Sequence, residues 1–292
     1  LQASTKDHVL IILKSKKMKR TYIVLISLLF FLGFSNCNKD EDPNQEPEPI
    51  PPTQLLIGEE YAIGAGLKVK YYAYEDPFVG YNKIYFEVND SISGDLINEN
   101  LDLSFVPMMD MGTMMHSCPT EPVEYMTDSK QYVGAAVYVM PSTAGVWNLN
   151  LTVSDTLNGV QGLASFEFEV LEPEEAKMVS FISDLDPDAR YFISLIQPTD
   201  PKVGENDFEI IINRKASMMD WPYEPYLNVE IEPEMPSMNH GSPNNVNPSH
   251  SGEGHYLGLT NFTMTGWWRV NMLVKDGEGN IINEDSYFDI TF

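Results

Sequence analysis

The chain repeats itself, and this internal repeat is the feature that most constrains its fold. Residues 76–82 (DPFVGYN) align with residues 200–206 (DPKVGEN) at an offset of 124. After a three-residue deletion the offset becomes 121, and Gly145 and Trp147 then align with Gly266 and Trp268. Between these blocks the first offset also aligns His116 with His240, Pro119 with Pro243, Tyr132 with Tyr256, Gly134 with Gly258 and Met140 with Met264. We therefore expect two homologous domains, residues 57–173 and 177–292.

Within each repeat the apolar residues recur with a period of two, which is typical of β-strands rather than helices. The segments pair between repeats as KIYFEVN and DFEIIIN, LDLSFV and LNVEIE, WNLNLTV and WRVNMLV, and SFEFEV and YFDITF. Turn residues separate them, for example the hairpin-like residues 275–280 (KDGEGN). About seven short strands per repeat predict an all-β protein with two tandem immunoglobulin-like β-sandwich domains. Trp147 and Trp268 are expected to fill the two cores.

The N-terminal segment predicts export and lipid anchoring. Basic residues after Met18, our expected translation start, precede an apolar run over residues 22–34. At 13 residues, this run is shorter than the roughly 20 that a membrane-spanning helix needs. Residues 32–37 (LGFSNC) resemble a lipobox, which implies that residues 1–36 are a lipoprotein signal peptide and that Cys37 is acylated.

The segment that follows, residues 37–56, is acidic and rich in proline, which predicts a disordered tether. Its acidic run at residues 39–42 (KDED) resembles the export tags of surface lipoproteins in the Bacteroidetes; a merely solvated linker is the alternative. We expect the mature protein in the bacterial cell envelope, anchored by its lipid to the outer membrane and facing either the periplasm or the exterior.

The charge of the chain narrows its partners. The net charge is −25, and from Cys37 onward 12 Lys and Arg stand against 42 Asp and Glu. Such a chain is repelled by nucleic acid and by anionic lipid surfaces, so cations are its natural ligands and only a lipid anchor would hold it to a membrane. Its two cysteines are Cys37 and Cys118, which leaves Cys118 without an internal disulfide partner if Cys37 is acylated.

Two loops concentrate methionine and histidine. Five of the 15 methionines lie in residues 108–116, and four of the five histidines lie in this loop or its counterpart, residues 235–255. Glycine, proline and asparagine surround them, which predicts exposed loops. Thioether and imidazole together suit copper, with Cu(I) favoured and Cu(II) possible. The alternative is a methionine-rich surface for a protein partner. The candidate ligands are Met111, Met114, His116, Met235, Met238, His240, His250 and His255.

The second repeat resembles a known family. The pattern Met235-x-x-Met238-x-His240, followed by residues 254–258 (GHYLG) and 264–268 (MTGWW), is similar to the YtkA-like/FixH-like domain. The first repeat keeps much of this pattern, including His116. The resemblance implies small extracytoplasmic β-sandwiches linked to copper handling and oxidase maturation. Met140 and Met264 also match it, but strand length places them, in our interpretation, away from the histidine loops, as core or turn residues.

No enzyme signature is present: the chain lacks His-Glu-x-x-His, Gly-x-Ser-x-Gly and a glycine-rich phosphate loop. We therefore expect a non-catalytic envelope lipoprotein that binds copper for storage, tolerance or delivery, with a copper-transfer or other envelope protein as its partner. The alternative is an adhesion or scaffolding lipoprotein whose immunoglobulin-like domains bind a protein or a glycan.

Overall fold

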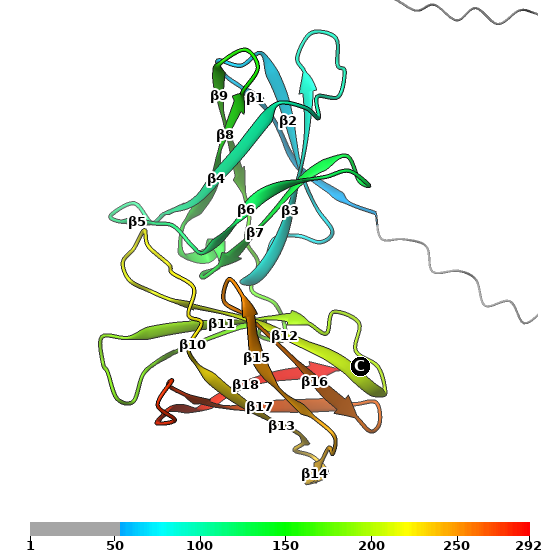
Figure 1. Cartoon of the computed structure of the whole chain (residues 1–292), viewed down its shortest axis with the longest axis vertical. Coiled ribbons are helices and arrows are strands. Elements are labelled where there is room, and N and C mark those ends of the chain that lie inside the picture. Colours follow the sequence, from blue (N-terminus) through cyan, green and yellow to red (C-terminus); the bar gives the residue numbers. More distant parts are fainter. Residues whose placement is uncertain (1–52) are drawn as a thin grey trace, which may run out of the picture. The chain divides into compact units, whose positions relative to one another are not determined.

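A computed structural model of the chain describes residues 53–292, so the expected signal peptide, Cys37 and nearly all of the tether lie outside the described residues. The described part is all-β: 18 strands form four antiparallel sheets, arranged as two sandwiches (Figure 1). A single 3-10 turn, Ser142–Ala144, is the one helical element of residues 53–292. No helix among these residues is long and apolar enough to cross a membrane.

The first sandwich pairs a five-stranded sheet with a four-stranded one. The five-stranded sheet has the order β1 (Leu55–Ala62), β2 (Leu67–Ala73), β3 (Gly80–Asp90), β7 (Gln131–Tyr138) and β6 (Thr120–Met126). The four-stranded sheet has the order β5 (Met115–His116), β4 (Leu101–Asp110), β8 (Val146–Asp155) and β9 (Val160–Phe168).

The second sandwich repeats this order strand by strand. Its five-stranded sheet contains β10 (Met178–Ile182), β11 (Arg190–Gln197), β12 (Gly204–Arg214), β16 (His255–Phe262) and β15 (Val246–Gly252). Its four-stranded sheet contains β14 (His240–Gly241), β13 (Asn228–Met235), β17 (Trp267–Lys275) and β18 (Ile281–Thr291). The predicted all-β class and tandem sandwiches are confirmed. Each sandwich has nine strands rather than about seven, partly because β5 and β14 are only two residues long.

Both predicted core tryptophans are fully buried. Trp147 and Trp268 have no exposed surface, and each is the second residue of a strand in which buried residues alternate with exposed or partly buried ones. The indole Nε1 of Trp147 donates to the carbonyl oxygen of Met140 at 2.9 Å, and that of Trp268 donates to Met264 at 2.9 Å. Each indole therefore buries its ring and still satisfies its one donor.

The repeated motif at residues 76–82 and 200–206 has a structural role. The buried amide of Asn82 donates to Phe78 O at 2.7 Å and Gly80 O at 2.8 Å and accepts from Phe78 N at 3.0 Å. Asn206 makes the same three hydrogen bonds in the second copy, two with the backbone of Lys202 and one with the carbonyl oxygen of Gly204. The asparagine thus satisfies backbone groups in the bend that leads into β3 and β12, which explains why the motif occurs in both copies.

Two compensating length changes separate the copies. The first change lies in the connection before the Met/His hairpin. From residue 214, the end of β12, to Leu227 the chain advances two residues more than from residue 90, the end of β3, to Leu101. The next hairpin is two residues shorter, because Met235 pairs with His240 whereas Met109 pairs with His116. The offset therefore returns to 124 at the histidines. In the strands themselves Met109, not Met111, is the counterpart of Met235.

Candidate functional site

The histidine of the first sandwich lies at the end of the four-stranded sheet beside a buried methionine. Met109 on β4 is directly opposite His116 on β5 and, on its other side, opposite Trp147 on β8. Met109 and Trp147 are 0% exposed and His116 is 3% exposed. The imidazole meets the indole edge to face, with ring centroids 5.6 Å apart. A thioether and an imidazole therefore lie side by side in a desolvated position.

The hydrogen bonds of His116 leave one ring nitrogen free. Its Nδ1 lies 2.9 Å from the carbonyl oxygen of Ser117, and because a carbonyl only accepts, Nδ1 carries the proton. In the neutral ring Nε2 then holds a lone pair, and this atom is buried without a hydrogen-bond partner. A buried polar atom without a partner is costly. Donation from one nitrogen to a backbone carbonyl is also the usual arrangement of a metal-binding histidine.

The second sandwich has the same arrangement in an open form. Met235 lies opposite His240 and is 4% exposed. Gly266 lies beside its methyl group and has a φ of +131°, which favours glycine. The His240 ring is exposed, lies 6.2 Å from Trp268 and has its Nε2 3.1 Å from the Thr263 hydroxyl. The two sites share their residue types but differ in solvent access.

The other predicted ligands of these loops are distributed over surface and core. Met111 is partly buried and packs against the first core. Met114 is 50% exposed and Met238 is 58% exposed, so both lie on the outer side of their hairpins. The expectation of wholly exposed loops is therefore wrong for His116, because the short strand β5 pairs it with Met109 beside Trp147. It is also wrong for Met235, because this residue is the last of β13 and not part of the loop.

The expectation that Met140 and Met264 lie away from the histidines is also wrong. Met264 follows Thr263, whose hydroxyl contacts His240, and its carbonyl accepts from the buried Trp268. Met140 has the same position relative to the first tryptophan and packs against the first core. Both methionines therefore lie at the same end of their sandwiches as the candidate sites.

His250 and His255 do not join the His240 site, contrary to our prediction. His255 begins β16 and Thr263, the residue that contacts His240, follows the end of that strand. Eight residues at about 3.3 Å each separate the two positions by roughly 26 Å. His250 on β15 is the cross-strand partner of Tyr256, and the two rings lie side by side. Its Nε2 accepts a hydrogen bond from the Gly254 amide at 3.3 Å. These two histidines lie at the opposite end of the second sandwich.

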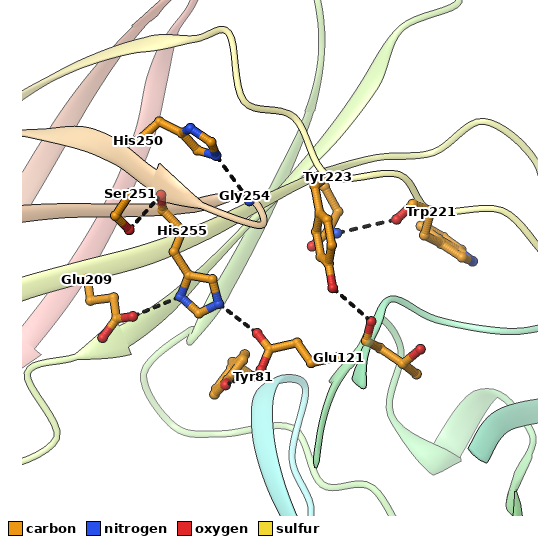
Figure 2. Close-up of polar contacts among 11 residues, drawn as sticks. Tyr81, Glu121, Glu209, Trp221, Tyr223, His250, Ser251, Gly254 and His255 are labelled. Atoms are coloured by element: carbon orange, nitrogen blue, oxygen red, sulfur yellow. Dashed lines mark hydrogen bonds and ion pairs between the residues drawn. The ribbon is translucent and has the colours of Figure 1, made fainter. Parts of the chain in front are cut away.

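His255 bridges the two sandwiches (Figure 2). Its Nε2 lies 2.7 Å from Oε1 of Glu121 on β6 of the first sandwich, and its Nδ1 lies 2.8 Å from Oε1 of Glu209 on β12 of the second. The other oxygen of Glu121 accepts from the Tyr81 hydroxyl at 2.9 Å. The hydrogen bonds to Glu121 and then to Glu209 raise the pKa of His255 to about 9, so the ring is an imidazolium at neutral pH.

Two further hydrogen bonds link the sandwiches. They join residues 117–121 of the first sandwich, a strip that ends at Glu121, to the long β12–β13 connection of the second. The Ser117 amide donates to the carbonyl oxygen of Met218 at 2.9 Å. The Tyr223 hydroxyl donates to the carbonyl oxygen of Thr120 at 3.2 Å (Figure 2). The sequence gives little signal for these contacts, because each joins residues that are more than 100 positions apart.

Cys118 is buried within the same strip. It is 4% exposed, has no disulfide partner among the described residues, and packs in the first core. Burial raises the pKa of its thiol well above the usual value, so it is a neutral thiol rather than a thiolate. Among residues 53–292 no three or more His, Cys, Asp or Glu are grouped as they would be to hold a metal ion.

Comparison with known families identifies the second sandwich. The family model described as YtkA-like matches residues 187–272, a range that includes β13, β14, β16 and hence the Met235–His240 site. Residues 187–272 therefore form a YtkA-like domain. The first sandwich lies outside the match, although its strand order is the same. The comparison with curated proteins gives no match.

Proposed function

We propose that this protein is an extracytoplasmic copper-binding lipoprotein that holds one Cu(I) at each Met/His site. The single observation that carries the proposal is the free, buried Nε2 of His116 beside the buried Met109. The corresponding pair, Met235 and His240, lies in the YtkA-like domain. Anchoring through Cys37 and placement at the outer membrane belong to the same proposal.

The chemistry of these groups favours copper. A thioether is a soft ligand that prefers Cu(I), and a neutral imidazole accepts the same metal. Neither ligand brings charge, so a monovalent ion fits a desolvated position better than a divalent one, whose charge would be costlier to bury. Met140 and Met264 are available as further thioethers at the same ends of the sandwiches. Binding or transfer of copper, rather than catalysis, is the proposed activity.

Titration of the purified protein with Cu(I) against a competing chelator tests this function. Met109→Leu and Met235→Leu each remove a sulfur while nearly conserving volume, so the fold should persist. We expect each variant to lose at least tenfold in affinity at its own site, and the double variant at both. Met272→Leu is the matched control, because Met272 is a buried methionine of β17, 1% exposed, whose cross-strand partners are Ile231 and Ser286.

The control should bind Cu(I) like the wild type. If the wild type binds Cu(I) no more tightly than the double methionine variant, the sulfurs are not ligands and the copper function is refuted.

A second candidate function has an observation of its own. Met114, Met115 and Met238 are 50–58% exposed at the outer sides of the two hairpins, and exposed methionines adapt readily to protein surfaces. In that case the hairpins would bind an envelope protein, and Met114→Ser with Met115→Ser would abolish capture of that partner while leaving Cu(I) titration unchanged.

A further inference from the structure

The two Met/His sites differ in burial although their strands correspond. In the first sandwich the four residues from His116 to Pro119 are all buried. Their counterparts from His240 to Pro243 are exposed or only partly buried. The hairpins that carry them have the same strand order, and the first is two residues longer than the second. Besides this difference in length, an element outside the first sandwich contacts the buried residues of the first site.

That element is the β12–β13 connection of the second sandwich. It approaches the first sandwich along residues 117–121, where Met218 accepts from the amide of Ser117 and Tyr223 donates to Thr120. Ser117 is also the residue whose carbonyl holds Nδ1 of His116. Ser117 thus bonds to the His116 imidazole through its carbonyl oxygen and to the second sandwich through its amide.

The third contact of the strip is an ion pair. His255 lies between Glu209 of its own sandwich and Glu121 of the first. The other titratable groups at this point are Tyr81 and Tyr223. Tyr81 faces the His255 ring and donates to Glu121. The pKa of Tyr223 is raised by burial and, to a smaller extent, by the nearby Glu121 carboxylate.

Glu253, on the turn before β16, also acts on Tyr223 and adds further negative charge. The imidazolium is the one cationic group among these residues, so its charge holds the two glutamates together across the contact.

We propose that the second sandwich is a cover for the first Met/His site and that His255 is its latch, so that the His116 site exchanges its ligand only when the two sandwiches separate. The identity of the ligand as Cu(I) depends on the function proposed above, whereas the covering of the site by the second sandwich does not. The His240 site stays open, which gives the protein one slowly exchanging and one rapidly exchanging site.

The cover can be tested without metal. Hydrogen–deuterium exchange of the Ser117 amide reports the cover directly, because its acceptor belongs to the second sandwich. The latch variant is His255→Gln with Tyr223→Phe, which removes the imidazolium and the hydroxyl bond but no proposed ligand. We expect exchange of this amide to be at least tenfold faster in the latch variant. The control, His250→Gln with Tyr226→Phe, changes the same hairpin and the same connection at exposed residues and should exchange like the wild type.

Release of Cu(I) to a chelator tests the consequence for the site. The wild type should release copper in a fast phase, which His240→Gln removes, and a slow phase, which His116→Gln removes. In the latch variant the slow phase should accelerate at least tenfold while the fast phase is unchanged.

The outcomes separate the two proposals. Unchanged exchange at Ser117 in the latch variant overturns the cover, and so does a slow phase that the latch variant does not alter. Absence of Cu(I) binding by the wild type overturns the copper function alone, since the exchange experiment contains no metal.

Discussion

The pH dependence of stability should reveal the charge of His255. The pKa of this histidine is raised from 6.5 to about 9 by its bonds to Glu121 and Glu209. At roughly 1.36 kcal/mol for each tenfold change in proton affinity, the rise from 6.5 to about 9 corresponds to at most about 3 kcal/mol. The side chains of His255, Glu121 and Glu209 are 20–23% exposed, so solvent screens part of this interaction. We expect roughly 1–2 kcal/mol from the imidazolium.

The sign follows from the direction of the shift. A histidine whose pKa is higher in the folded protein binds its proton more tightly there, so folding is favoured while the unfolded histidine is also protonated. This contribution is complete below pH 6.5 and is lost as the pH rises through about 9. The stability difference between the wild type and His255→Gln should therefore be largest near pH 6 and close to zero at pH 10.

Urea unfolding of both proteins at pH 6, 7.5, 9 and 10 measures this difference. Changes in other groups cancel, because the two proteins differ at one residue. His250→Gln is the matched control, as it removes a histidine from the same hairpin without contact to either glutamate. A deficit of His255→Gln that is the same at pH 6 and pH 10 would refute the electrostatic argument and leave packing as the cause.

Three other changes have defined outcomes. Asn206→Ala should destabilise the protein by roughly 2–3 kcal/mol in urea unfolding, because three part-buried hydrogen bonds to the backbone are lost. Asn158→Ala in an exposed turn should cost far less. The segment 177–292 should fold alone, since it has its own core around Trp268; a molten product by near-ultraviolet circular dichroism would contradict this. Cys37→Ser should abolish metabolic labelling by a palmitate analogue, and equal labelling of the variant would exclude acylation at this residue.

The fold was predictable because its signals are local. Alternating segments such as 147–153 give strands, turn residues such as Asp276 with Asn280 give hairpins, and the repeat requires whatever fold one copy adopts to be adopted by the other. The number of strands was underestimated partly because the two-residue strands β5 and β14 carry no periodicity of their own.

The site was only partly predictable. The motif aligned Met111 with Met235, but the strand register makes Met109 the counterpart, since a longer connection and a shorter hairpin cancel before the histidines. Burial of His116 could not be foreseen, because it depends on the pairing of the two-residue strand β5 with Met109, which leaves no periodicity in the sequence. His255 was assigned to the wrong end, since loop proximity in sequence was taken for proximity in space. Its partner Glu121 lies 134 residues away.

Because the connection between the sandwiches is short, even a weak contact between them can persist. Only residues 169–177 separate β9 from β10, so each sandwich meets the other at an effective concentration on the order of millimolar. A few hydrogen bonds and one ion pair would not hold two free proteins together at micromolar concentration, but they suffice within one chain. Docking is thus a property of the tandem: cleaving the connection should separate the halves without unfolding either, and mixing them again should not restore the contact.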